Sequence, residues 1–385
     1  MADETPRINS LDLVRGAVMV LMAIDHVRVY SGLPAGGPTA GIFFTRWVTH
    51  FSAPAFAFLA GTAAFLHARK LADVAAMSRF LVTRGLFLVV LELTLLRFLW
   101  TFNFDYAHYI LAGVIWMLGW CMVLLAGLIR FQPRTIAVVG LILIFLQPLV
   151  GLAGSAVPES ATAARGLFQF LYFGGPVALG SGGASIAVLY SIVPWVGVMA
   201  AGYGFGTVMV RSPEDRRRLC LRIGLGATAL FLAAAGLAVA LQPAGENAPP
   251  VLFRLLGQRK YPASALFLLM TLGPTIALLP VAERARGWLA DGLATFGRVP
   301  MFYYLLHIPL IHLAAMVVSV VRTGAVSPWL FGNHPMAPPE LPAGYQWSLP
   351  LLYLVFGAVI AILYLPCRWF AALKARRKGG WLTYV

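Results

Sequence analysis

The chain has 385 residues, of which 60% are hydrophobic and only 11% charged, with a formal net charge of +15. Soluble domains carry about a quarter charged residues, so this composition excludes an ordinary soluble protein and indicates an integral membrane protein. In such a protein a positive net charge is typical of basic cytoplasmic loops, so we expect no nucleic-acid partner. Seven histidines and three cysteines without metal-binding spacing predict no metal.

Apolar stretches of about 20 residues, the length that an α-helix needs to cross a bilayer, recur along the chain. We predict an all-α bundle of about ten transmembrane helices that forms a single membrane domain over residues 1–385. The predicted spans are 11–31, 43–66, 78–100, 109–130, 135–153, 187–210, 222–242, 263–282, 296–321 and 347–369.

The connections between these spans alternate in composition. One set carries most of the Lys and Arg residues, whereas the loops 32–42, 154–186, 243–262 and 322–346 are rich in Gly, Pro and Ala and carry few cations. Basic loops stay on the cytoplasmic side, so we predict that both termini are cytoplasmic. The loop 154–186 mixes aromatic residues with glycine and is expected to lie at the interface or to cover a cavity.

The first span carries ionisable residues that an ordinary anchor helix does not need. Charged side chains inside spans are costly and usually face a bundle interior or a wet cavity. Arg15 and His26 are 11 positions apart, which places them on one helix face about 16 Å apart along the axis. Asp12 and Arg15 also suit a simple ion pair at the helix end. His26 lies deeper, beside Asp25, and for these two we favour a functional role.

The second and third spans add two buried polar residues. His50 is predicted at about the depth of His26, so the two imidazoles could face one outer cavity; a histidine bonded to a neighbouring backbone is the alternative. Glu92 lies in the middle of the third span and needs a partner from another helix or a raised pKa. A purely structural ion pair is equally consistent with Glu92.

Further polar residues cluster toward the outer side. Arg97 follows Glu92 on the third span, and Asp105 and His108 follow at its outer end. Lys260 and Tyr261 precede the eighth span from outside.

The ninth span carries His307 and His312, five positions apart. One of them is expected to face the same cavity as His26, but the spacing does not decide which. The neighbouring Tyr303 and Tyr304 have the composition of an interfacial belt.

No phosphate-binding glycine loop and no GxSxG motif occurs in the sequence. The buried His, Glu and Arg residues suit proton transfer or acyl transfer.

The segment SLDLVRGAVMVLMAIDHVRVY resembles the first helix of membrane-bound acyltransferases. In the acyltransferase type 3 group, an Arg-Gly pair precedes a His at the spacing of Arg15 and His26. Five blocks in order, LDLVRG, HFSAPAFAFLAG, RGLFLVVLELT, KYPASALFLLMTLGP and FGRVPMFYYLLHIPLIH, are most similar to the bacterial relatives of the heparan-α-glucosaminide N-acetyltransferase family.

The resemblance implies O- or N-acyl transfer across the membrane, from cytoplasmic acetyl-CoA or another acyl-CoA to an extracytoplasmic glycan, amino sugar or small molecule. It implies that His26 acts as general base or transient acyl carrier, with His50 and Glu92 as supporting acid/base groups. Arg15, with Asp12, would hold the donor. The expected acceptor-binding set is Asp25, Arg97, Asp105, His108, Lys260, Tyr261 and His307. We expect a multi-pass protein of the bacterial inner membrane, in contact with lipids; oligomer formation stays open.

Two departures limit what is carried over from the family. The lysosomal enzyme of the family is thought to carry acetyl on a histidine in the loop between its first two helices, but loop 32–42 here contains no histidine. An aspartate of that enzyme is replaced here by His50. An acetyl-histidine relay therefore has no direct match in this sequence, and the heparan-type amino-sugar substrate is not carried over.

The alternative function is a proton-coupled transporter or flippase, because His26, His50 and Glu92 would also suit a proton relay. The absence of a visible internal repeat counts against a transporter. A non-catalytic scaffold or sensor would have little reason to keep so many charged groups within its spans.

Overall fold

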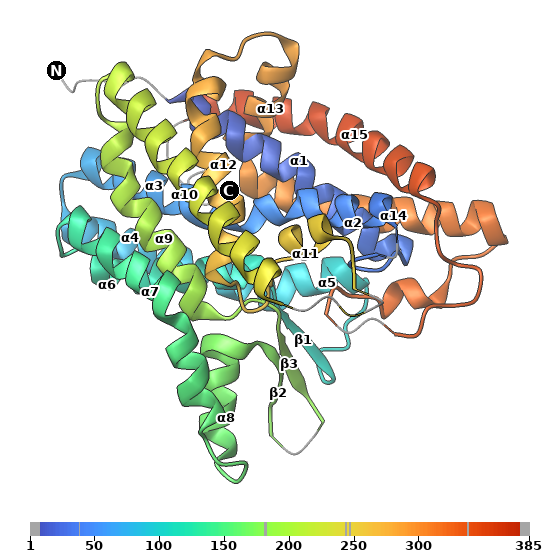
Figure 1. The fold of residues 1–385 in the computed structure, drawn as a ribbon. Helices are drawn as coiled ribbons and strands as arrows, with labels where there is room; N and C mark the ends of the chain where they lie inside the picture. Colours follow the sequence, from blue (N-terminus) through green and yellow to red (C-terminus); the bar gives the residue numbers. More distant parts are fainter. Residues whose placement is uncertain are drawn as a thin grey trace.

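The computed structural model of the protein describes residues 8–37, 39–180, 183–242, 245, 248–336 and 339–377. It is 76% helical, and its long helices form a bundle with a small sheet on one side (Figure 1). The predicted all-α membrane fold is therefore confirmed.

Within the described residues, eight helical stretches are long and apolar enough to cross a membrane. Two of them are interrupted: α2 and α3 are joined by the 3-10 turn η1, and α4 and α5 by the π-helical turn η2. The eight stretches are α2–η1–α3 (Ala40–Trp47, Val48–Phe51, Ser52–Leu71), α4–η2–α5 (Val74–Leu91, Glu92–Leu96, Arg97–Thr101), α7 (Pro133–Ser155), α9 (Ile192–Met209), α10 (Pro213–Leu241), α12 (Ala265–Arg284), α14 (Pro300–Thr323) and α15 (Leu349–Arg376).

The other two predicted spans are also helical, but they do not share these properties. Helix α1 (Asn9–Ser31) is long and rich in charged residues, whereas α6 (Val114–Leu128) is apolar and has only 15 residues. The eight apolar helices support a multi-pass membrane protein, and the predicted positions of the two termini stay a prediction.

Several predicted boundaries are wrong for identifiable reasons. The fourth and sixth predicted spans begin in strands, β1 (Tyr109–Ala112) and β3 (Ser185–Val188), because a short apolar strand looks like the end of an apolar helix. The ninth predicted span joins two helices, α13 (Trp288–Arg298) and α14. The chain breaks there because the residue before Pro300 is disfavoured in helical conformation.

Helix α1 lies in the interior of the bundle and packs against α3, α12, α13, α14 and α15. Its closest approach is to α13. A Cβ on Gly16 would lie 1.8 Å from the Leu293 carbonyl oxygen, and a Cβ on Gly297 would lie 1.8 Å from that of Asp12. Only glycine permits this backbone contact. The glycine of LDLVRG is therefore a packing requirement, and it brings the start of α1 against the end of α13.

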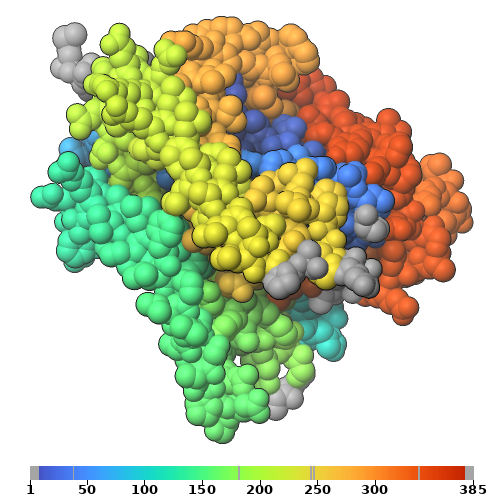
Figure 2. Space-filling view, viewed as in Figure 1, coloured from blue at the N-terminus to red at the C-terminus, as the bar shows by residue number. Residues whose placement is uncertain are grey.

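A second group of elements lies to one side of the bundle. It contains α8 (Thr162–Phe168), the π-helical turn η3 (Gln169–Phe173) and a three-stranded sheet in the order β1-β3-β2. Strand β2 (Gly175–Ala178) pairs antiparallel with β3, and β1 pairs parallel with β3 in the register Tyr109↔Ser185 to Ala112↔Val188. Figure 2 shows the end of α7 and α8 projecting from the body of the molecule.

This sheet positions the segments that follow β1 and β3 beside the interior of the bundle. The amide of Leu189 donates to the carbonyl of Ala112, which joins the ends of β3 and β1. Gly113, which follows β1, and Leu189 and Tyr190, which follow β3, line a cavity in the bundle. Elsewhere α11 (Val251–Leu256) precedes α12, and the described part of loop 322–346 is irregular apart from the 3-10 turn η4 (Pro328–Phe331).

Candidate functional site

Two cavities lie along helix α1 and differ in their walls. The first, which we call the Arg15 cavity, has a volume of about 310 Å³. Its charged lining residues are Arg15, Arg84, Arg298 and Lys374, and most of its other walls are apolar, including Met19, Met22, Phe56, Leu88, Leu118 and Met122. A cavity with several cations and otherwise apolar walls suits a ligand that has both an anionic part and an apolar part.

The second cavity, which we call the His26 cavity, has a volume of about 240 Å³. Its polar lining residues are Asp25, His26, Arg28, Arg46, Glu92, Tyr190 and Tyr261. Tyr304 and Val114 line both cavities. The two cavities are therefore neighbours that share these two side chains as a wall, and the centroid of the Tyr304 ring lies 6.3 Å from that of the His26 ring.

Arg15 is held at the wall of its cavity by contacts that include an acidic side chain and a backbone carbonyl. Its Nη1 donates to Asp12 Oδ1 and to the Gly297 carbonyl oxygen, both at 3.1 Å. The ion pair within α1 that the spacing allowed is thus present, and Asp12 orients Arg15 from behind. The second contact depends on the close packing of α1 against α13.

His26 contacts a second histidine. Its Nδ1 lies 2.7 Å from Nε2 of His307, and the two rings stack with centroids 4.8 Å apart. The Nδ1 of His307 lies 2.8 Å from the Tyr304 carbonyl oxygen and 3.2 Å from that of Tyr303. Because a carbonyl can only accept, Nδ1 of His307 carries the hydrogen, and in the neutral ring Nε2 is an acceptor.

These contacts fix the tautomer of the neutral pair. His26 must donate from Nδ1 to His307, so its Nε2 keeps a free lone pair. His26 lines the second cavity, where the edge of Trp100 packs against its ring at a centroid distance of 4.8 Å. An imidazole oriented in this way, with a second group behind it, has the arrangement of a general base.

These contacts show which of the two histidines of α14 lies beside His26. His307 is fully buried and bonds to His26, whereas His312, one and a half turns further along α14, stacks between Tyr30 and Phe102 at centroid distances of 4.8 and 4.1 Å. The structure therefore brings His307 to His26 and places His312 in an aromatic stack.

Glu92 is fully buried and begins the π-helical turn η2. Its Oε2 accepts from the backbone amides of Ile115 (2.8 Å) and Trp116 (3.3 Å), in the first turn of α6. Its Oε1 has no hydrogen-bond partner among the described residues, and Glu92 lines the His26 cavity. A Cβ on Gly113 would lie 2.6 Å from this oxygen, so that glycine makes room for the carboxylate.

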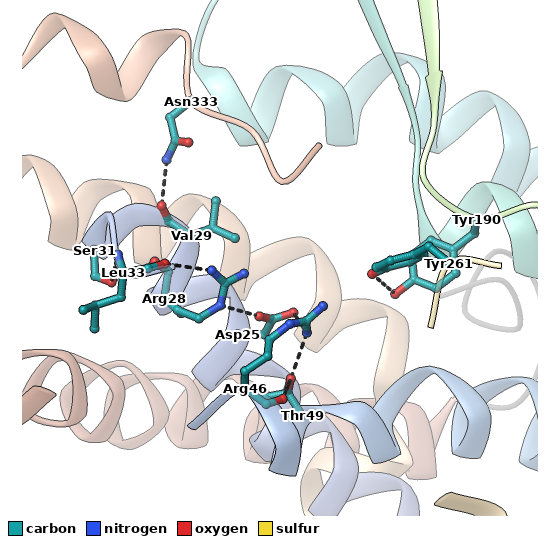
Figure 3. Close-up of polar contacts among 10 residues, drawn as sticks. All are labelled: Asp25, Arg28, Val29, Ser31, Leu33, Arg46, Thr49, Tyr190, Tyr261 and Asn333. Carbon is teal, nitrogen blue, oxygen red and sulfur yellow. Dashed lines mark hydrogen bonds and ion pairs between the residues drawn. The ribbon is translucent and has the colours of Figure 1, made fainter. Parts of the chain in front are cut away.

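An ion cluster forms another wall of the His26 cavity. Asp25 Oδ1 accepts from Nε of Arg28 at 2.9 Å, and its Oδ2 accepts from Nη1 of Arg46 at 2.7 Å. Figure 3 shows Asp25 between these two arginines. Arg28 also donates to the Leu33 carbonyl, and Arg46 to Thr49 Oγ1. Both carboxylate oxygens are thus occupied by arginine.

Lys260 and Tyr261 lie beside this cluster. Lys260 is only 7% exposed, and its Nζ lies 5.6 Å from the ring centroid of Tyr190 and 5.2 Å from that of Tyr261. Burial lowers the pKa of Lys260, and Arg46 lowers it further against the opposing effect of Tyr261. Burial would raise the pKa of Tyr261, but Lys260 and Arg46 outweigh burial and hold it below its usual value. The lowered pKa of Tyr261 indicates positive charge around its hydroxyl.

Seven predicted site residues are not among those that line either cavity. Three of them, Asp12, Lys260 and His307, contact residues that do line a cavity. The other four are His50, Arg97, Asp105 and His108. His50 lies in η1 with its ring edge toward Phe267. Arg97 is buried and holds the following loop, donating to the Tyr109 and Asn103 carbonyls at 3.0 and 2.7 Å. Asp105 and His108 are exposed and form a pair at 2.7 Å; the hydrogen bond from His108 lowers the pKa of Asp105. Their roles in acceptor binding or catalysis stay predictions.

Other residues of the site had not been singled out from the sequence. Arg46, Trp100 and Tyr190 carried no signal, because each lies near the end of a predicted span, where arginine and aromatic residues are common. The sequence favours an interfacial belt for Tyr304, yet its side chain is buried and lines both cavities. Among the described residues no group of three or more His, Cys, Asp or Glu could hold a metal ion.

Comparison with known proteins identifies the family. The model of the heparan-α-glucosaminide N-acetyltransferase catalytic domain matches residues 7–238, more than half of the chain. The match includes Arg15, His26 and Glu92, and ends before Lys260 and His307. No match was found among curated proteins. The chain therefore belongs to the family of the heparan-α-glucosaminide N-acetyltransferase catalytic domain and is a membrane enzyme of the acetyltransferase type.

Proposed function

We propose that the protein transfers an acetyl or other acyl group from acyl-CoA in the Arg15 cavity to a hydroxyl or amino group of an acceptor in the His26 cavity. The observation that carries this proposal is the wall that two chemically different cavities share at Tyr304 and Val114, beside His26. With the orientation predicted from the basic loops, the donor enters from the cytoplasm and the acceptor, a glycan or small molecule, from outside.

The Arg15 cavity matches the two halves of an acyl-CoA. The guanidinium groups of Arg15, Arg84 and Arg298 would bind the phosphates, since arginine pairs well with phosphate oxygens. The apolar walls would hold the pantetheine arm. Arg15 and His26 are about 16 Å apart along α1, a distance that an extended pantetheine arm can span. The thioester would then lie near Tyr304.

In the proposed reaction His26 Nε2 takes the proton from the acceptor hydroxyl or amine as its oxygen or nitrogen attacks the thioester carbonyl. The carbon–sulfur bond breaks, and the leaving CoA thiolate takes the proton back from His26. The charge that His26 carries between these steps is stabilised by its Nδ1–H hydrogen bond to His307. Glu92 Oε1 would accept a second hydrogen bond from the acceptor.

Transfer is favoured over transport by the family match, since the matched model is that of an acetyltransferase catalytic domain. The ionisable groups in the spans are equally consistent with acyl transfer and with proton-coupled transport, so they do not distinguish the two functions.

The donor site is tested by ligand-dependent thermal stability of the purified protein in nanodiscs. Acetyl-CoA must raise the melting temperature if it binds the folded protein. Arg15→Ala should remove this increase, whereas Arg134→Ala, an exposed arginine at the start of α7, should retain it. An equal increase in the Arg15 variant would contradict the proposed donor site, as would the absence of an increase with acetyl-CoA and longer acyl-CoAs in the native protein.

A further inference from the structure

The charges buried around the His26 cavity do not balance. Arg28 and Arg46 line the cavity, and Lys260 lies beside its wall residues Tyr190 and Tyr261; each of the three cations is less than 10% exposed. Among the described residues the carboxylates in the lining are Asp25 and Glu92, so three buried cations face two carboxylates. An uncompensated buried charge is strongly unfavourable in a protein interior. A bound anion would remove this cost.

Asp25 does not compensate all the nearby positive charge, because its single negative charge is already shared by two arginines. Oδ1 pairs with Arg28 and Oδ2 with Arg46. Over the ranges that the structure describes, no carboxylate forms an ion pair with Lys260. Its ammonium group is instead placed near the faces of Tyr190 and Tyr261.

The surplus cations are held in place by structure around them. Lys260 lies in a tight turn, where it bridges to Ala263, and the Ser264 amide donates to the Arg259 carbonyl at 2.9 Å. In Figure 3 the Tyr190–Tyr261 pair, whose hydroxyls are 3.4 Å apart, lies on the side of Arg46 away from Arg28. Both tyrosines and both arginines line the cavity. Fixed donors around a small space give a site of defined shape for an anion.

We propose that Arg46, Lys260 and Tyr261 form an oxyanion-binding subsite, and that the acceptor therefore carries a carboxylate or a phosphate in addition to the group that is acylated. That the bound anion belongs to the acceptor rests on the proposed function. Anion binding itself can be tested without any acyl transfer. A volume of about 240 Å³ is below the range for drug-sized ligands and suits a group the size of one sugar unit.

The experiment measures binding of three small probes to the purified full-length protein by calorimetry. Methyl β-D-glucuronide and methyl β-D-glucoside differ only in the carboxylate, and inorganic phosphate tests the other oxyanion. We expect the glucuronide, the phosphate or both to bind at least about tenfold more tightly than the glucoside. The stronger of the two anions identifies which oxyanion the subsite takes.

Variants locate the subsite. Lys260→Met keeps the apolar stem and should weaken anion binding at least about tenfold, whereas Lys260→Arg should restore it. Lys70→Met, at the exposed end of α3, is the matched control and should bind as the native protein does. If Lys260→Met does not fold, the comparison of the probes on the native protein still tests the subsite.

Three results would overturn the subsite: equal binding of glucoside and glucuronide without phosphate binding, no saturable binding of either anion, or unchanged anion binding in folded Lys260→Met. Binding of acetyl-CoA is measured on the same samples. Acetyl-CoA binding without anion discrimination would reject the subsite alone, and anion discrimination without acetyl-CoA binding would reject the proposed donor site alone.

Discussion

The two cavities along α1 differ in how their polar groups are held. In the Arg15 cavity, cations from α1, α4, α13 and α15 lie around mostly apolar walls. In the His26 cavity, polar side chains are fixed by several partners: His26 by His307, Asp25 by two arginines, and Glu92 by two amides of α6. Charged groups around an apolar space suit binding of a long ligand, whereas fixed polar groups suit stabilisation of a reacting centre.

The largest expected effect is that of a substitution at His26, which should reduce acyl transfer but not acetyl-CoA binding. We predict that His26→Ala lowers acyl transfer by about 10²–10⁴-fold, the usual contribution of a general base. Release of CoA thiol in the presence of an acceptor measures transfer. The variant should still gain thermal stability with acetyl-CoA, because the donor cations lie in the other cavity. Native transfer rates in this variant would contradict the role of His26.

The second prediction concerns the partner of His26. His307→Phe removes the acceptor that orients His26 and keeps a ring in the stack, so kcat should fall by about a hundredfold with little change in KM for the donor. His307→Gln, which offers a carbonyl acceptor, should recover part of the loss.

The matched control for His307 is His312→Phe, in the same helix. His312 packs between two aromatic rings, so the substitution should leave transfer near the native rate. Equal losses in the His307 and His312 variants would indicate a general disturbance of α14 and would contradict a specific role for His307.

The third prediction concerns the donor cations. Arg298→Ala should weaken acetyl-CoA binding by about tenfold at low ionic strength, since one charged contact to a phosphate contributes about 1.4 kcal/mol or more. The affinity of the native protein should fall as salt is added, because salt screens charges near solvent. A salt-independent affinity, measured by calorimetry, would indicate that the phosphates do not meet these cations.

The smallest expected effect on activity comes from helix packing. Gly16→Ala forces α1 away from α13, where a Cβ would lie 1.8 Å from a carbonyl oxygen. We expect a loss of about 1–3 kcal/mol in the free energy of unfolding, and weaker acetyl-CoA binding because Arg15 loses its contact with Gly297.

Gly236→Ala in α10 is the matched control for helix packing, since a Cβ there meets no atom within 4 Å. Chemical denaturation should show equal or greater stability, as alanine favours helix. Equal stability of Gly16→Ala and Gly236→Ala would contradict the packing requirement at Gly16.

Sequence reasoning recovered the helices because a span needs a long apolar run, and such runs are plain in this chain. It missed the strands β1 and β3, each only four residues long, because their apolar residues continue into the helices that follow. It also extended the ninth span across Pro300, where an apolar stretch hides a change of helix.

Geometry within one helix can be predicted from sequence. The spacing of Arg15 and His26 predicts one face of α1 with the two residues about 16 Å apart along the axis. In the structure Arg15 lines one cavity and His26 the other, and their roles stay predictions. Contacts between helices could not be predicted in the same way. The pairing of His26 with His307 joins residues 281 positions apart, and the burial of Arg46 against Asp25 depends on how α1 meets α2. A sequence pattern contains neither of these distances.

The most direct test of the account is photolabelling with an acyl-CoA that carries a diazirine in a short acyl chain. A third cavity, of about 590 Å³, also has arginines in its lining, namely Arg217, Arg218 and Arg284. Photolabelling therefore distinguishes between two arginine-lined cavities as the donor site. We predict acetyl-CoA-protected label on α1 near Met22 and on α14 near Tyr304. Protected label on α10 or near Arg284 instead, or none at all, would contradict the meeting of donor and acceptor at His26.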